Sequence, residues 1–336
     1  MKKITAIILI SIFVFFNGSS IKAQQTRTRK ADTINAPNNY KPLNAKSSPE
    51  LQTLLNSAVS ETINQFSAKG VKAENVAATL IDLRDANNSK IANVRGGEKI
   101  YPASVVKLFY MTALYQQIQD GKIKLTPELE RGLKDMIVDS SNEATQYILD
   151  VLTDTSSGGE MPLKEFEIWS YKRNAVNRYF ASMNFENINV NQKTFCEDAY
   201  GREQQFRNYK GENRNMLTTN ATARLLAEIT LGKAVNVEKS GLMMSLLKRE
   251  PFAETTDKDD QAHGFTGIAL INKDLKSVKI WSKAGWTSKT RHDAAYIETP
   301  DGLKFVLVVF TENFANERDI IPTIAGKILD GLGKIK

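Results

Sequence analysis

Strand-like segments at both ends of the chain enclose a long middle section with helical spacing. Val76–Leu83 and Ile91–Val94 are short apolar runs on either side of an Asn-Asn-Ser turn, which predicts a hairpin. Runs rich in β-branched and aromatic residues return near the C-terminus and predict four more strands, at Phe265–Ile271, Val278–Ser282, Ala294–Glu298 and Leu303–Thr311. Such an order predicts an α+β fold in which both ends share one antiparallel sheet.

Helical periodicity marks the other segments. Residues 50–69 place apolar side chains at spacings of three and four, and Gly70 is expected to end this helix. From Ser104 to about Ile229 the spacing is mainly helical with polar breaks, and Asp319–Leu332 is helical again. The middle of the chain is therefore predicted to form a helical lobe.

The N-terminus has the pattern of a secretory signal peptide. Lys2 and Lys3 precede the apolar run Ile4–Phe16, and the small residue Ala23 is the expected cleavage site. The run is shorter than the roughly 20 residues that span a bilayer, so a permanent membrane span is not expected. We expect an exported protein, periplasmic or secreted, with residues 1–23 removed.

The remaining chain is predicted to contain one folded domain. Residues 24–49 are polar and are expected to form a linker that cannot bury enough apolar surface to fold. The domain is expected at residues 50–336, with a sheet lobe from residues 50–100 and 262–336 and a helical lobe from residues 101–261.

Composition excludes several classes of function. Loss of three lysines with the signal peptide lowers the formal charge from +7 to +4, a mildly basic balance that requires no nucleic-acid partner. Cys196 is the single cysteine, so the chain has no intrachain disulfide. Two isolated histidines, His263 and His292, do not predict a metal site, and nothing predicts an organic cofactor.

A serine and a lysine lie three residues apart where a helical period begins, in Tyr101-Pro-Ala-Ser-Val-Val-Lys. This spacing puts the side chains of Ser104 and Lys107 on one face of a helix. A serine hydroxyl needs a base to attack an acyl group, and a lysine that is neutral through desolvation or a nearby cation can serve. The pair alone also occurs by chance in most proteins of this size, and a serine at the start of a helix is usually a cap.

Two further motifs follow in the chain, Ser140-Ser141-Asn142 in the helical section and Lys283-Ala-Gly285 in a strand-like context. With Ser104-x-x-Lys107 they match the order Ser-x-x-Lys, Ser-Asp-Asn, Lys-Thr-Gly. From about residue 50 to its end, the chain resembles the class A β-lactamase and penicillin-binding-protein superfamily of serine hydrolases. The resemblance implies a five-stranded antiparallel sheet flanked by helices, beside a mainly helical lobe.

The resemblance also implies roles for these residues. Ser104 would form the acyl-enzyme, Lys107 would accept or relay its proton, and Ser140 would protonate the leaving nitrogen. Lys283 would keep Lys107 neutral and attract a substrate carboxylate. Asn142 would hold the amide carbonyl of the substrate. The backbone from Gly285 to Trp286 would also contact the substrate, and Trp286 N–H and Ser104 N–H would form the oxyanion hole. Arg291 would be a second ligand of the substrate carboxylate. Trp286 is also a candidate wall of the cleft, and a solvated surface arginine is the alternative for Arg291.

Two residues depart from the pattern of the superfamily. Ser141 replaces the usual aspartate, whose role there is structural. Ala284 replaces a hydroxyl residue that donates to the substrate carboxylate, and one lost bond to a charged group costs about 1.5–3 kcal/mol.

Hydrolysis of an acyl-enzyme needs a base that activates water, and the superfamily uses a loop glutamate for this step. Glu203 precedes the Thr219 region at about the expected distance, but Asn208 lies five positions after it where four are usual. Glu186 and Glu212 are weaker candidates, and an ordinary solvated carboxylate is the alternative for all three.

Three functions remain open at this point. The first is opening of β-lactam rings through acyl-Ser104, and the second is a D-alanyl-D-alanine peptidase that acts on cell-wall peptides. A third is a penicillin-binding sensor that is acylated without turnover. A Ser-His-Asp triad with His292 and Asp293 is also conceivable, but the chain has no Gly-x-Ser-x-Gly motif. We expect a monomer with a small-molecule β-lactam or D-Ala-D-Ala peptide substrate.

Overall fold

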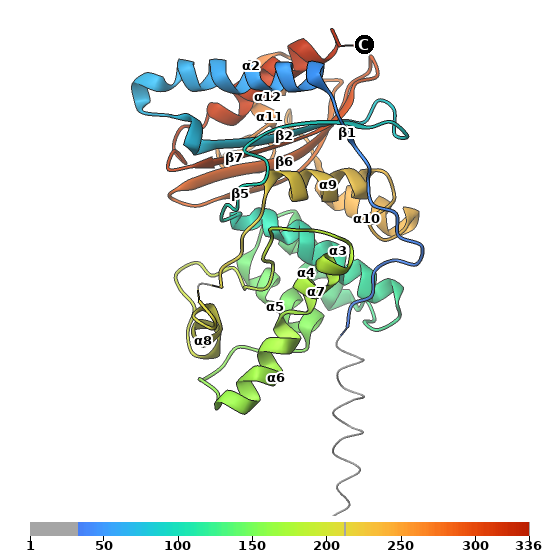
Figure 1. Ribbon diagram of the computed structural model, residues 1–336, viewed down its shortest axis with the longest axis vertical. Coiled ribbons are helices and arrows are strands. Elements are labelled where there is room, and N and C mark those ends of the chain that lie inside the picture. Colours follow the sequence, from blue (N-terminus) through green and yellow to red (C-terminus); the bar gives the residue numbers. More distant parts are fainter. Residues whose placement is uncertain (1–32, 212, 336) are drawn as a thin grey trace, which may run out of the picture. The chain divides into compact units, whose positions relative to one another are not determined.

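The computed structural model describes residues 33–211 and 213–335, which form one compact unit from Ile34 onward (Figure 1). The predicted signal peptide at residues 1–23 lies outside the described residues. Within the described ranges, no helix is both long and apolar enough to cross a bilayer.

One mixed sheet organises the fold, and both ends of the chain contribute to it, as predicted. The strands follow the order β1-β3-β2-β7-β6-β5-β4. Five strands form the antiparallel centre, and their bounds are β2 (Val76–Asp82), β3 (Lys90–Val94), β5 (Lys279–Trp286), β6 (Thr290–Glu298) and β7 (Lys304–Glu312).

The expected five strands are corrected to seven by two short edge strands. β1 (Lys46–Ser47) pairs with β3 in parallel, so the sheet is not purely antiparallel. β4 (Lys248–Arg249) pairs with β5 at the other edge. Two-residue strands carry no alternating pattern of their own, which is why the sequence gives no sign of them.

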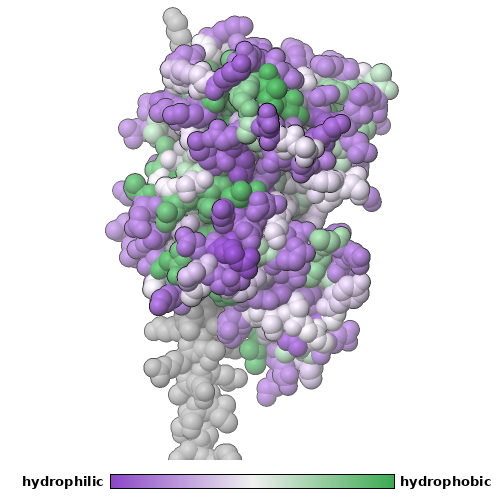
Figure 2. All heavy atoms as spheres, turned by 180° about the vertical axis from the view of Figure 1, so that it is seen from behind, coloured by the Kyte–Doolittle hydropathy of each residue, from purple (hydrophilic) through white to green (hydrophobic). Residues whose placement is uncertain are grey.

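Helices cover both faces of the sheet (Figure 1). On one face lie α2 (Pro49–Gln65), α11 (Gly267–Asn272) and α12 (Ile320–Leu332), and on the other lie α9 (Thr219–Thr230) and α10 (Val237–Leu247). Because both faces of the sheet are covered, alternate side chains of β7 are buried on opposite faces. Val306, Val308 and Phe310 belong to one hydrophobic cluster, and Phe305, Leu307 and Val309 belong to the other. On the face shown in Figure 2, the remaining hydrophobic residues form patches that hydrophilic side chains separate.

The middle of the chain forms the helical lobe that its periodicity predicts. Its central helix is buried on all sides over most of its length and begins at Lys107. Three short 3-10 turns, η1 (Ser67–Lys69), η2 (Ala73–Asn75) and η3 (Ala103–Val106), lie before that helix in the chain. The lobe's helices are α3 (Lys107–Gln119), α4 (Pro127–Ile137), α5 (Asn142–Thr153), α6 (Leu163–Arg173), α7 (Ala175–Ser182) and α8 (Arg202–Arg207).

The strand predicted at Phe265–Ile271 is wrong, because this segment contains helix α11. A short apolar run has no periodicity that distinguishes a buried strand from a buried helix. Its burial is one-sided, with Ala269 and Leu270 buried and Ile271 exposed. Gly267 also packs tightly, since a Cβ there would lie 1.9 Å from the Ala262 carbonyl oxygen.

The polar linker expected at residues 24–49 is corrected for its described part. Ile34 is buried in the core, and β1 belongs to this segment. Tyr40 Oη donates to Glu228 Oε2 at 2.7 Å, and the backbone N–H of Leu43 donates to Glu228 Oε1 at 2.9 Å. One buried carboxylate on α9 thus fixes a segment that is too polar to fold by itself.

Candidate active site

Ser104 lies on η3, directly before the buried helix α3. Ala103 has φ of 46° and Ser140 has φ of 57°, a left-handed conformation that costs non-glycine residues energy and occurs often at functional sites. η3 packs against β5 so closely that a Cβ on Gly285 would lie 2.6 Å from the Ser104 backbone nitrogen. Glycine is therefore required at this position of the predicted Lys-x-Gly motif.

Ser140 joins the two predicted lysines. Its Oγ accepts hydrogen bonds from Lys283 Nζ at 2.9 Å and from Lys107 Nζ at 3.3 Å. Lys107 Nζ also donates to the Ser140 carbonyl oxygen at 2.5 Å and to Asn142 Oδ1 at 3.0 Å. Members of three motifs from distant parts of the chain thus lie in contact.

Burial lowers the pKa of both lysines. Desolvation lowers the pKa of Lys107 to about 7, against the opposing influence of Glu143 and Cys196. Desolvation also lowers the pKa of Lys283 well below its usual value, and the nearby charges of Lys107 and Arg249 lower it further. At neutral pH a substantial fraction of Lys107 is an uncharged amine.

The second motif, Ser140-Ser141-Asn142, lies at the N-terminus of helix α5. Ser141 is the N-cap of α5, where its Oγ accepts from the Ala144 N–H at 3.1 Å. This supports the structural role that its position implies. Asn142 follows and donates from Nδ2 to Cys196 Sγ at 3.5 Å, so the exposed free thiol lies beside the site, which the sequence did not indicate.

Gln261 is a site residue that the sequence analysis missed. Its Oε1 accepts from Lys283 Nζ at 2.6 Å and from the Ala284 N–H at 3.1 Å. Its Nε2 donates to the carbonyl oxygens of Ile137 and Val138 at 2.9 and 2.7 Å. This amide joins the sheet to the helical lobe, and no local sequence pattern distinguishes it from any other loop glutamine.

These residues surround a pocket of about 570 Å³. Ser104, Ser140, Asn142, Gly285 and Trp286 line it, which brings five of the predicted site residues into one space. Trp286 is half exposed and also lines this pocket.

Comparison with known proteins decides the family. Residues 58–332 match the Beta-lactamase enzyme family. The chain belongs to this family. The β-lactamase of Sphaerobacter thermophilus superposes with a TM-score of 0.58 at 20% identity and covers 83% of this chain and 98% of its own.

Two other structures show the same fold. A variant of a class A β-lactamase of the last common ancestor of Gram-negative bacteria has a TM-score of 0.59 at 16% identity, with coverage of 84% of this chain and 100% of its own. PBP-A has a TM-score of 0.57 at 17% identity, with coverage of 88% and 100%. No curated protein matches the sequence.

Within this β-lactamase-family fold, Arg291 is not available as a ligand. It is buried, and its guanidinium donates to the carbonyl oxygens of Ala315 and Gly264, both at 2.9 Å, and to the carboxylate of Asp259. The two interpretations of Arg291, a carboxylate ligand or a solvated surface residue, are therefore both wrong. A buried arginine uses its donors internally because unpaired ones are costly.

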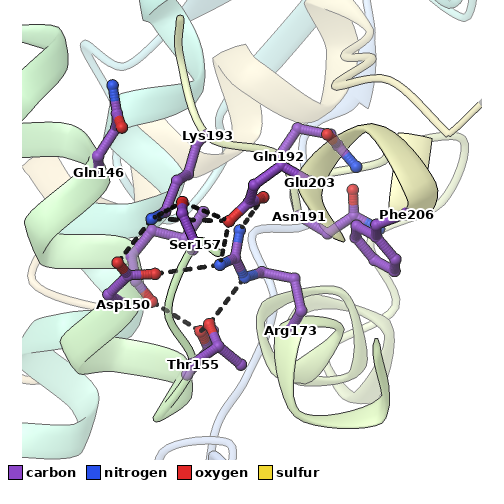
Figure 3. Close-up of polar contacts among 12 residues, drawn as sticks. Gln146, Asp150, Thr155, Ser157, Arg173, Asn191, Gln192, Lys193, Glu203 and Phe206 are labelled. Atoms are coloured by element: carbon purple, nitrogen blue, oxygen red, sulfur yellow. Dashed lines mark hydrogen bonds and ion pairs between the residues drawn. The ribbon is translucent and has the colours of Figure 1, made fainter. Parts of the chain in front are cut away.

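Glu203 lies apart from the Ser104 pocket, so the structure does not support its candidacy as the deacylating base. It is buried on α8, where Arg173 donates to its two carboxylate oxygens at 2.8 Å each. Ser157 Oγ donates to the same carboxylate at 2.9 Å, and Lys193 Nζ lies 3.6 Å away (Figure 3). The spacing of residues in the sequence could not show that the Glu203 carboxylate is bound by Arg173.

His292 belongs to the framework and not to a triad. Its Nε2 is 2.9 Å from the Tyr101 carbonyl oxygen, and its Nδ1 accepts from the Thr311 N–H at 3.1 Å. Both ring nitrogens therefore contact backbone groups, which excludes a Ser-His-Asp triad that uses His292 as its base. The contact with Tyr101 ties β6 to the segment that carries Ser104.

Acid is expected to weaken the fold through His292. Its burial lowers the pKa to about 4 from 6.5, so the unfolded chain binds the proton more readily than the folded one. The stabilisation is complete above about pH 6.5 and is lost as the pH falls towards 4, in total about 3 kcal/mol. Urea unfolding at several pH values should show a flatter dependence over this window in His292→Gln. An equal slope in both proteins would contradict the assignment.

Proposed function

We propose that the chain is an exported serine hydrolase that opens β-lactam rings through an acyl-Ser104 intermediate. The observation that carries this proposal is Ser140 Oγ, which lies between the amines of Lys107 and Lys283 in the pocket that Ser104 lines. Family membership and the motif order support it. A variant of PBP-A, which shares the fold, forms an acyl-enzyme with penicillin-G. The export step rests on the sequence of residues 1–23.

Lys107 has the hydrogen-bonding capacity of a base. A neutral amine has two hydrogens, and the two closest acceptors are the Ser140 carbonyl oxygen and Asn142 Oδ1. Its lone pair is then left for a hydroxyl proton. In the proposed reaction the Ser104 oxygen attacks the lactam carbonyl carbon and Lys107 receives its proton, directly or through Ser140. The C–N bond then breaks, and Ser140 donates a proton to the leaving nitrogen.

Backbone N–H groups are the proposed oxyanion stabilisers. Ser104 N–H lies where η3 faces β5, and Trp286 N–H is at the end of that strand. Such fixed dipoles require no reorganisation when negative charge develops on the carbonyl oxygen. The strict need for glycine at position 285 supports this role, because any side chain there would push Ser104 away from the strand.

Incubation of the mature protein with a chromogenic cephalosporin tests the proposal. We expect a covalent adduct on Ser104 by intact mass, together with a colour change from ring opening. Ser104→Ala removes the nucleophile, so it should show neither, while its circular dichroism stays that of the native protein. Labelling of the Ser104→Ala protein at the native rate would refute the assignment.

A second candidate is a peptidase or sensor that is acylated without rapid release. The position of Glu203 favours it, because that carboxylate is closed off by Arg173 and does not line the pocket. The lifetime of the adduct distinguishes the two functions, since rapid release defines a β-lactamase and a stable adduct defines the alternative. Glu203→Gln is expected to leave this lifetime unchanged, whereas a water-activating glutamate would make the variant trap the acyl form.

A further inference from the structure

Gln261 is a buried side chain that connects Lys283 to the C-terminal end of α4. Its Nε2 donates to the carbonyl oxygens of Ile137 and Val138 at 2.9 and 2.7 Å. Its Oε1 accepts from Lys283 Nζ at 2.6 Å and from the Ala284 N–H at 3.1 Å. Carbonyl oxygens cannot donate and backbone N–H groups cannot accept, so one orientation of this amide satisfies all four contacts. Gln261 therefore presents a fixed acceptor to the Lys283 amine.

The fully buried amine of Lys283 contacts Ser140 and two oxygens that can only accept. Its Nζ lies 2.9 Å from Ser140 Oγ, 2.6 Å from Gln261 Oε1 and 2.7 Å from the Ala284 carbonyl oxygen. An ammonium group has three hydrogens and can donate to all of these oxygens. A neutral amine would give its two hydrogens to the obligate acceptors, and its lone pair would then bind the Ser140 hydrogen. The charge of Lys283 thus decides where the hydrogen of Ser140 points.

Burial and neighbouring charges act against the ammonium form of Lys283. Desolvation lowers the pKa of its amine, the charges of Lys107 and Arg249 lower it further, and Asp293 raises it. A hydrogen bond that is accepted from the charged form favours that form. Gln261 Oε1 accepts such a bond at 2.6 Å and adds no charge to the site. The amide therefore favours the form of Lys283 that donates to Ser140.

We infer that Gln261 is a positioning residue, which holds Lys283 as a donor to Ser140 and so leaves the Ser140 hydrogen free to reach the leaving nitrogen of the substrate. The inference rests on the proposed function, because it assumes that Ser104 is acylated and that Ser140 is the acid. It gives a role in the acid step to a residue that lies outside the three motifs.

Each proton in this step has a source and a destination. Lys107 accepts the Ser104 proton as the Ser104 oxygen bonds to the carbonyl carbon. The electron pair of the breaking C–N bond stays on the nitrogen, which takes the proton of Ser140. The Ser140 oxygen then regains a proton from Lys107, whose Nζ lies 3.3 Å away. Lys283 keeps its proton throughout and acts only on the direction of the Ser140 hydrogen.

Two acyl donors that share a phenylacetamido group and differ in their leaving group test this inference. Benzylpenicillin breaks a C–N bond, and its nitrogen needs a proton to leave. A phenylacetylglycyl thioester breaks a C–S bond, and its thiolate leaves without one. Acylation of Ser104 is measured in single turnovers with protein in excess, from lactam absorbance and from thiol release. Because general acid catalysis is weakened, Gln261→Met should slow the penicillin reaction about tenfold and the thioester reaction less than about twofold.

A second variant separates the acceptor from the connection to α4. Gln261→Glu loses the donors to α4 but keeps an oxygen for Lys283, so its penicillin-to-thioester rate ratio should stay near the native value. The ratio does not depend on the folded fraction, so partial unfolding leaves it unchanged. Gln117→Met removes another buried glutamine, which donates to the Leu152 carbonyl oxygen at 3.3 Å and does not line the pocket, and should keep the native ratio. An equal loss in Gln261→Glu and Gln261→Met would overturn the inference.

A double variant tests whether Gln261 acts through Ser140. Ser140→Ala removes the proposed acid and should lower the same ratio, and the addition of Gln261→Met should lower it no further. A further fall in the double variant, or a native ratio in Gln261→Met, would reject the positioning role and leave the proposed function intact. Native protein that is acylated by neither compound would reject the proposed function and the inference with it.

Discussion

Replacing Lys107 by methionine is expected to lower the rate of Ser104 acylation by about 10³-fold, within the range typical of a lost general base. The amine has a pKa of about 7 because burial disfavours its charged form. Methionine has a similar length and no charge, so it fills the buried site and cannot accept the serine proton.

The pH dependence provides the sharper measurement. Acylation by the native protein should rise as the pH increases through about 7, because Lys107 must lose its proton to act as a base. Lys107→Met should lose this rise along with most of the rate. Lys124→Met, which changes an exposed loop lysine, is the matched control and should keep both. Rapid acylation of Lys107→Met with an unchanged pH profile would show that another group takes the proton.

Much of the fold could be predicted because its elements carry their own periodicity. The hairpin of β2 and β3, the strands β5 to β7 and the helices α2 and α12 follow the predicted order. Members of two other motifs, 33 and 143 residues away in the chain, also contact Ser140. A motif order is a strong signal because each of its members has a chemical role that restricts its residue type.

The errors have a common physical cause, which is that a partner distant in the sequence decides the outcome. Ile34 is held in the buried core and Tyr40 is held by Glu228, while α11 packs its Gly267 closely against Ala262. The resemblance suggests roles for Arg291 and Glu203 from their positions in the chain, although each has an internal partner of opposite charge. No local pattern contains these partners, so no reading of local pattern could find them.

Glu203 belongs to a cluster of four charged side chains whose charges balance. Arg173 and Lys193 supply two positive charges, and Asp150 and Glu203 supply two negative ones (Figure 3). Arg173 is fully buried, and its guanidinium also lies 4.5 Å from the centre of the Trp169 ring. The cluster ties α5, α6 and α8 to the loop that contains Lys193.

Arg173→Met is therefore expected to destabilise the protein by about 3–5 kcal/mol, because it leaves an uncompensated carboxylate in the interior. Urea unfolding followed by circular dichroism measures the loss. Arg131→Met also removes an arginine that pairs with two helix carboxylates, but those pairs are exposed and screened by water, so it should cost much less stability than Arg173→Met.

A double variant tests whether charge balance is the reason. Arg173→Met combined with Glu203→Leu leaves Lys193 paired with Asp150 at 2.6 Å, so no buried charge lacks a partner. The double variant should then be more stable than Arg173→Met alone, although it carries one more substitution. Additive losses would mean instead that packing around Trp169, and not electrostatic balance, makes Arg173 necessary. In either case the native rate of Ser104 acylation per folded molecule should persist, because the cluster does not line the pocket.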